Sequence, residues 1–188
     1  MNSPAQRIVS RIVPEPGFRS HEVAVKVAEV ALVHEQLVQA ASGLSAAQLG
    51  WQPAPGRNTL GMLLAHIAVA EVHIGCVVLR AERDSDIMGV LGIRMDDDGM
   101  PLAADGTPPP RLDGEPLPFF ADLLERALAH TRAACRELGD DVLGLEIVRP
   151  PRPDGSVRVF DRRWGLYHMV EHAAGHLGQL QALKHLLP

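Results

Sequence analysis

Three histidines near the C-terminus, His168, His172 and His176, are spaced four residues apart. On an α-helix, residues four apart lie one turn above each other, with about 5–6 Å between their Cβ atoms. At this separation two imidazoles can bind one metal ion, as in the helical two-histidine motif of zinc proteases. The spacing therefore predicts that a helix in this region carries part of a metal site.

The position of each histidine around this helix indicates which of them can face the protein interior. The helix has an apolar stripe, formed by Leu166, Val170, Ala173, Leu177 and Leu180. At about 100° per residue, His176 lies about 60° from the centre of the stripe, His172 about 100° and His168 about 140°. His172 and His176 therefore face the edge of the core, whereas His168 points further toward solvent.

A third ligand is expected from another helix, because catalytic zinc typically has three protein ligands and one open position. His66 and His73 share one flank of the helical segment 59–80, and either could supply it. His34 is a rival, since it lies within the apolar stripe of the segment 20–41. A single inward histidine is more often a hydrogen-bonded core residue than a ligand.

Glu71 projects onto the apolar stripe of the segment 59–80, where a carboxylate needs a partner. One interpretation is that it binds the free ring nitrogen of a metal-ligating histidine. The other is that it pairs with an arginine and has no chemical role. The sequence does not separate these two interpretations.

Four segments have the periodicity of amphipathic helices and would position these side chains. They span about residues 20–41, 59–80, 118–138 and 162–187. Ser20 is a candidate N-cap for the first helix, and Gly139 is expected to end the third. Four such helices predict an all-α fold, a four-helix bundle in a single domain over residues 1–188, with an N-terminal extension at 1–19.

Two segments between the helices are expected to lack helical structure. Residues 84–117 are rich in Pro and Gly and predict a long loop, of the kind that forms lids or binding loops and that can cross the bundle. Within it, the acidic run 96–99 fails the spacing of a calcium loop. Before the last helix, the runs 145–148 and 157–160 flank a Pro-Asp-Gly turn and predict a small β-hairpin.

Composition excludes several classes of function. The net charge of −5 argues against nucleic-acid binding, which requires a basic face. Cys76 and Cys135 are too few for a disulfide framework and are expected to be free thiols in a reducing cytoplasm. Residues 1–17 show no apolar signal region, and polar side chains interrupt the apolar stretch 60–79. We expect a cytoplasmic protein without a membrane span.

Two parts of the chain resemble DinB-like proteins. The first is the segment 44–56, LSAAQLGWQPAPG, followed by LLAHIA at 63–68. The second is RWGLYHMVEH at 163–172, continuing to HLGQ at 176–179. The second match is the more specific, and the four helices agree with the family in their order.

The resemblance implies a bundle with up-down-down-up topology that is often a homodimer. It also implies one divalent metal ion, zinc or nickel, bound by one histidine of the second helix and two of the fourth. On this chain these residues are His66, His172 and His176. The family includes transferases and isomerases that use bacillithiol, mycothiol or glutathione, so a low-molecular-weight thiol is an expected cosubstrate.

We therefore expect a metal-dependent thiol S-transferase that acts on a small electrophilic molecule. Candidate bases for the thiol proton are His34, Glu71 and His168. Candidates for binding a carboxylate of the substrate or thiol are Arg158, Arg162 and Arg163. Metal-assisted hydrolysis would use the same three metal ligands. A non-catalytic metal-binding stress-response bundle would instead need a fourth protein ligand, such as His34.

Overall fold

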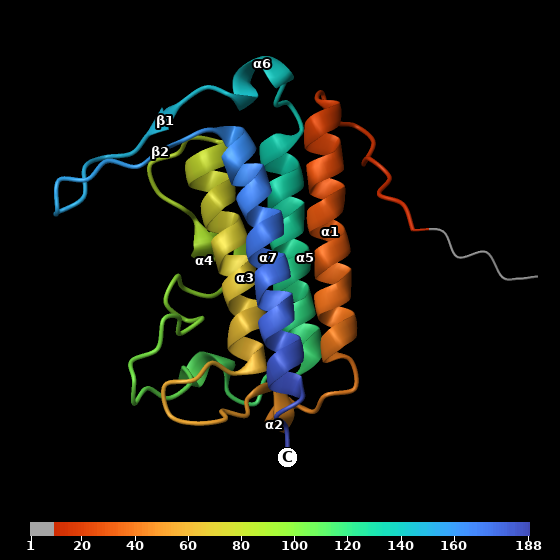
Figure 1. Ribbon diagram of the computed structural model, residues 1–188, viewed down its shortest axis with the longest axis vertical. Helices are drawn as coiled ribbons and strands as arrows, with labels where there is room; N and C mark the ends of the chain where they lie inside the picture. The colour runs from red at the N-terminus through yellow and green to blue at the C-terminus, as the bar shows by residue number, and fades with distance from the viewer. Residues whose placement is uncertain (1–9) are drawn as a thin grey trace, which may run out of the picture.

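The computed structural model describes residues 10–188, and four long helices form a bundle in this part of the chain (Figure 1). They are α1 (His21–Ala41), α3 (Leu60–Ile74), α5 (Leu117–Cys135) and α7 (Arg162–Lys184). A π-helical turn, Gly75–Leu79, extends α3. Figure 1 shows α1 and α7 running in one direction and α3 and α5 in the other. The predicted all-α fold and up-down-down-up topology are confirmed.

Each long helix packs against two others. α1 contacts α7 and α5, and α3 contacts α5 and α7. Because α3 and α5 run in parallel, the chain must return along the length of the bundle between them (Figure 1). The long segment after α3 makes this return and passes the outer side of α3.

The helices begin where the sequence offers caps. Ser20, Thr59 and Asp161 each accept a hydrogen bond from the backbone N–H three residues further on, at the starts of α1, α3 and α7. The third long helix is shorter than predicted, because it ends at Cys135. Gly139, the predicted end, is instead the N-cap of the short helix α6 (Asp140–Leu143).

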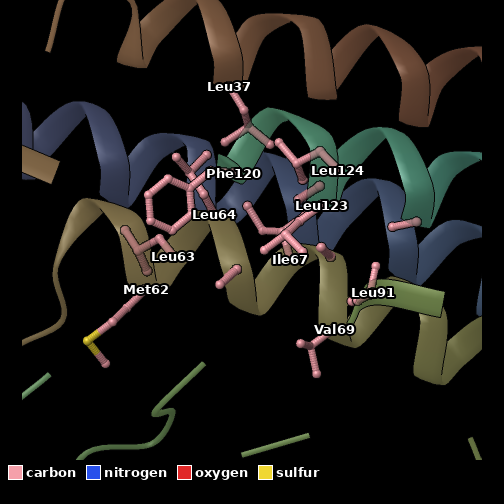
Figure 2. Close-up of a cluster of buried hydrophobic side chains, with 14 of the residues drawn as sticks. Leu37, Met62, Leu63, Leu64, Ile67, Val69, Leu91, Phe120, Leu123 and Leu124 are labelled. Carbon is pink, nitrogen blue, oxygen red and sulfur yellow. The ribbon is translucent and has the colours of Figure 1, made fainter. Parts of the chain in front are cut away.

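The core is aliphatic, and Figure 2 shows part of it, with Leu37 of α1, Leu64 of α3 and Phe120 of α5. Phe120 is 1% exposed and packs directly on the backbone of α3 at Gly61. A Cβ atom at Gly61 would lie 2.7 Å from the ring, so only glycine permits this contact. The stretch Leu60–Leu79 is long and apolar enough to cross a membrane, but 83% of its most apolar window is buried as the core helix.

The segment 84–117 is more ordered than the sequence predicts. It contains the short helix α4 (Ile87–Leu91) and a 3-10 turn, Pro110–Leu112. Four of its apolar side chains are buried in the main core: Ile87, Leu91, Ile93 and Leu112. A five-residue helix is too short to give a periodic signal, which explains why the prediction of a segment without helix was wrong.

The predicted hairpin forms with shorter strands. β1 (Ile147–Val148) pairs antiparallel with β2 (Val159–Phe160), and Ile147 lies opposite Phe160. The hairpin projects from the end of the bundle at which α3 ends and α7 begins (Figure 1). Its second strand leads directly into α7, so it stands next to the helix that carries the histidines.

The remaining segments lie at the ends of the bundle. The short helix α2 (Ala46–Leu49) follows α1 and is closed by a capping box between Ser45 and Gln48. The first nine residues of the predicted N-terminal extension, 1–19, and most of the segment tested for a signal lie outside the described residues. In the remainder, Glu15 forms an ion pair with Arg132 of α5, at 2.6 Å.

Candidate metal centre

The structure brings His66 of α3 together with His172 and His176 of α7. Each offers one ligand atom, and these atoms all lie within 4.8 Å of one another. The Nε2 atoms of His172 and His176 are 3.1 Å apart. Two nitrogens bound to one tetrahedral zinc ion at 2.0–2.1 Å would be about 3.3 Å apart. The donor set and its spacing therefore fit a divalent metal ion.

Neighbouring side chains orient two of these imidazoles. The Nδ1 atom of His66 lies 2.8 Å from Oδ2 of Asp98, which leaves Nε2 to face the other histidines. The Nδ1 atom of His176 lies 2.9 Å from Oε1 of Gln179, one turn further along α7. Such bonds to the outer ring nitrogen fix the orientation of metal-ligating histidines.

Asp98 is a site residue that sequence analysis missed. It is 3% exposed, and its other oxygen, Oδ1, accepts a hydrogen bond of 3.0 Å from the backbone N–H of Met100. The sequence showed it only as part of an acidic run in the segment 84–117. The one signal in the sequence for this contact was the acidic run itself, because the segment that carries it is long enough to return along the bundle past His66.

The two cluster histidines of α7, His172 and His176, are held in the neutral form. Burial, together with the nearby rings of His176, His66 and His168, lowers the pKa of His172 to about 3. Burial also lowers the pKa of His176. Metal binding requires neutral imidazoles, so both side chains are ready to bind metal at neutral pH without releasing a proton.

His34 and Glu71 lie elsewhere, in the core between α1, α3 and α5. His34 Nε2 is 2.8 Å from Glu71 Oε2, and the hydroxyl of Thr131 donates a 2.7 Å hydrogen bond to Glu71 Oε1. Their exposed fractions are 5% for His34 and 4% for Glu71. The partners of Glu71 are His34 and Thr131, so neither of its two expected partners, a cluster histidine or an arginine, is found.

His73, the other flank candidate, also lies outside the cluster. Its Nδ1 atom is 3.0 Å from the hydroxyl of Ser85. Within residues 10–188, no fourth His, Cys, Asp or Glu joins the three cluster histidines. Among the described residues, the cluster therefore offers three ligands of these types and leaves the fourth tetrahedral position to another group.

A row of stacked rings leads from the hairpin to the cluster along α7. Trp164 stacks on Phe160, with 5.3 Å between ring centroids, and His168 stacks on Trp164 at 4.6 Å. The next ring, His172, is 5.6 Å from His168. The Nδ1 atom of His168 lies 2.9 Å from Oε2 of Glu171. His168 thus stands between the cluster and the hairpin, with its Nε2 atom not engaged by Glu171.

A cleft of about 320 Å³ lies beside this row, between α3, the hairpin and α7. Its volume is at the lower end of the range for small-molecule sites. His168 lines the end nearest the cluster, and arginines of the hairpin segment line the other end. The π-helical turn Gly75–Leu79 contributes Val77 and Val78 to its wall. π-helical turns occur frequently at functional sites.

Of the three predicted carboxylate-binding arginines, Arg158 lines the cleft. Arg162 instead donates hydrogen bonds to the carbonyl oxygens of Leu79 and Val142, at 2.8 and 3.2 Å. Arg163 pairs with Glu22 of α1 at 3.0 Å. Arg162 and Arg163 thus hold α7 to its neighbours. The structure adds Arg149 and Arg152 to the cleft, and neither was predicted.

Both cysteines lack the properties of a nucleophile. Cys76 and Cys135 are buried as free thiols. Burial raises the pKa of Cys135 to about 12 and also raises the pKa of Cys76. The thiolate is the reactive form of cysteine, so neither side chain is prepared for attack on a substrate.

Fold and site together define a four-helix bundle with a cluster of three histidines that could bind a metal ion. The family model of the DinB superfamily matches residues 29–180, and the chain belongs to this superfamily. Among solved structures, the chain is similar to a conserved protein from Enterococcus faecalis, with a TM-score of 0.62 and 16% identity. The match covers 87% of this chain and 95% of that protein. It supports the fold. A search of curated proteins gives no match.

Proposed function

We propose that the protein is a metal-dependent enzyme that transfers a low-molecular-weight thiol to a small electrophilic molecule. The supporting observation is the open cluster of His66, His172 and His176 next to a cleft. Catalytic metal sites typically keep one position free for substrate, whereas structural sites fill all four with protein ligands. A non-catalytic site would need a fourth ligand such as His34, which lies in the core beside Glu71.

Each group around the cluster has a part in this proposal. A zinc or nickel ion held by the three imidazoles would supply the positive charge that ionises a thiol. The contacts with Asp98 and Gln179 orient His66 and His176 so that their Nε2 atoms would be available to hold such an ion. The neutral imidazoles leave the charge of the ion uncompensated.

His168 is the proposed acceptor of the thiol proton. It lines the cleft and lies one helical turn from His172. Its Nδ1 atom is bound by Glu171, so Nε2 remains to accept a proton. The other two candidate bases, His34 and Glu71, contact each other in the core, and the proposal does not use them.

The test begins with metal analysis of protein purified without chelator, which should contain about one divalent metal ion per chain. Metal-loaded protein is then mixed with glutathione, mycothiol or bacillithiol and a haloarene or epoxide. At least one thiol should react faster with the parent protein than with the His176→Ala variant. His185→Ala, which removes a histidine just after α7, is the matched control and should keep the parent rate.

Two results would overturn the transferase proposal. One is that no thiol reacts faster with the parent than with His176→Ala. The other is that His185→Ala loses as much activity as His176→Ala. Acceleration of ester or amide hydrolysis without any thiol would identify the same centre as a hydrolase, in which the metal activates water.

A further inference from the structure

The cleft beside the cluster is positively charged on a negatively charged protein. The chain carries a net charge of −5. Nevertheless, of the residues that the structure describes, three arginines line the cleft, Arg149, Arg152 and Arg158, and no Asp or Glu does. Clefts lined by charges of one sign concentrate ligands of the opposite sign. The cleft therefore has a local positive charge that favours an anion, although the net charge of the chain is negative.

Two of these arginines have no acidic partner. In residues 10–188, neither Arg152 nor Arg158 forms an ion pair within 4.0 Å, whereas Arg19, Arg80 and Arg163 do. Arg149 differs, because its guanidinium donates to the carbonyl oxygens of Glu82 and Arg83, at 2.8 and 2.7 Å. Arg149 thus fastens the hairpin to the end of α3, and the other two remain free for a ligand.

The guanidinium of Arg158 is positioned by aromatic rings. It lies 5.7 Å from the ring centroids of both Phe160 and Trp164. Cation–π contacts of this kind hold a guanidinium in place and leave its N–H edge available. The arginine charges also reach across the cleft, because Arg149 and Arg158 add to the effect of burial in lowering the pKa of His73.

Apart from the three arginines, His73 and His168, the residues that line the cleft are apolar. They include Ile74 and Val77 of the α3 side and the rings of Phe160 and Trp164. A ligand here needs an apolar body in addition to its charge, because small-molecule sites combine apolar walls with a few polar groups that fix orientation.

We propose that this cleft binds a small molecule that has a carboxylate at the hairpin end and an apolar body along α7. Arg152 and Arg158 bind the carboxylate, for which the planar guanidinium provides parallel N–H donors. The far end of the ligand reaches His168, next to the metal ligands. From Trp164 to His172 the helix rises about 12 Å, and a tripeptide-sized molecule spans about 10 Å.

This inference deepens the proposed function, because it names the class of molecule held at the same site. The carboxylate belongs either to the thiol or to the electrophile. Binding in the cleft does not require the metal, so it is tested on chelator-treated protein. Failure of the thiol-transfer assay and failure of this test are therefore distinguishable.

The experiment measures the affinity of metal-free protein for 3-phenylpropionate by isothermal titration calorimetry. The neutral analogue, 3-phenylpropanamide, has the same shape without the charge. We expect the carboxylate to bind at least about tenfold more tightly than the amide, the factor that one charge-assisted hydrogen bond of about 1.5 kcal/mol supplies. The double variant R152Q/R158Q should lose this difference.

Arg126→Gln is the matched control, because Arg126 lies on α5, away from the cleft, where it pairs with Asp122. It should bind the carboxylate as the parent does, and circular dichroism should show parent-like helicity for every variant. The proposal is overturned if the amide binds as tightly as the carboxylate. It is also overturned if R152Q/R158Q keeps the parent affinity, or if 3-phenylpropionate shows no binding.

Competition identifies the source of the carboxylate. S-methylglutathione carries the carboxylates of a thiol cosubstrate but no free thiol. If it displaces 3-phenylpropionate from the parent and does not bind R152Q/R158Q, the arginines hold the thiol. If it does not displace the probe, the arginines hold the carboxylate of the electrophilic substrate.

Discussion

His66 and His34 each have a carboxylate oxygen 2.8 Å from a ring nitrogen, yet the two pairs lie in different surroundings. Asp98 contacts the Nδ1 atom of His66, so the opposite nitrogen faces His172 and His176. Glu71 contacts the Nε2 atom of His34, and its other oxygen binds Thr131. The first pair leaves a nitrogen directed at other ligands, whereas the second is enclosed by three helices.

The difference shows what a histidine near an apolar stripe needs in order to bind metal. A carboxylate partner is common to both pairs, although the His66 side chain is 23% exposed and the His34 side chain only 6%. Only at His66 does the carboxylate occupy the outer nitrogen while further donors converge on the inner one. The His66 pair should therefore control metal binding, and the His34 pair should control stability.

The largest expected effect is loss of the metal from the cluster. His172→Ala and His176→Ala should each lower the metal content from about one ion per chain to near zero, because two ligands hold a divalent ion weakly. The measurement is elemental analysis after dialysis against metal-free buffer. Retention of the parent metal content in either variant would place the site elsewhere.

Removal of Glu71 should affect stability and leave the metal in place. Glu71→Ala leaves His34 and Thr131 without a buried partner, and we expect the free energy of unfolding in urea to fall by about 3 kcal/mol. Metal content should remain about one ion per chain. Glu125→Ala, at an exposed position of α5, is the control and should change stability by less than about 0.5 kcal/mol. Loss of metal at unchanged stability would reverse the roles assigned to the two pairs.

Asp98→Asn should weaken metal binding by about 10–100-fold, the usual effect of removing a partner of a metal-ligating histidine. Both oxygens of Asp98 accept hydrogen bonds, from His66 and from the N–H of Met100. An amide offers one acceptor, so one of these bonds must be lost. Competition with a metal-binding dye measures the affinity.

Asp97→Asn is the control for this substitution, because Asp97 is buried in the same turn but bonds to Arg94. We expect it to keep an affinity within about twofold of the parent, because its partner Arg94 has a side chain that is 68% exposed and an ion pair with an exposed partner contributes little. An equal loss in both variants would mean that metal binding depends on the turn as a whole and not on the contact with His66.

The last expected effect is on the acid stability of metal-free protein. The pKa of His172 is about 3 in the folded state against 6.5 ordinarily. Between these values the unfolded chain binds a proton that the folded chain does not, so stability falls as the pH drops from 6.5 toward 3. Thermal unfolding of chelator-treated protein should show this decrease, and His172→Gln should reduce it. An unchanged slope in the variant would contradict the assignment.

Local signals in the sequence predicted much of the fold and part of the site. The helical periodicity and the cap at Ser20 are set by residues a few positions apart, and the structure agrees closely with them. His172 and His176 lie one turn apart for the same local reason. The choice of His66 over His73 was different, because both lie on one flank of α3 and only the family resemblance selected between them.

The parts that sequence reasoning missed depend on contacts between distant residues. Asp98 is 32 residues from His66, and Thr131 is 60 residues from Glu71. Whether such groups meet depends on how the helices pack and where the long segment returns. Arg149 and Arg152 line the cleft because the hairpin packs against the end of α3. The periodicity of the sequence does not predict this packing.

The contact between Asp98 and His66 also couples two properties of the protein. One is the docking of the segment 84–117 against α3, and the other is the affinity of the cluster for metal. Any factor that docks the segment against α3 strengthens metal binding, and by thermodynamic linkage the metal strengthens docking by the same factor. The amide of Met100, which donates to Asp98, should therefore exchange hydrogen more slowly in the loaded protein than in the metal-free protein. A molecule that draws the segment away from α3 would favour release of the metal without touching any of its three ligands.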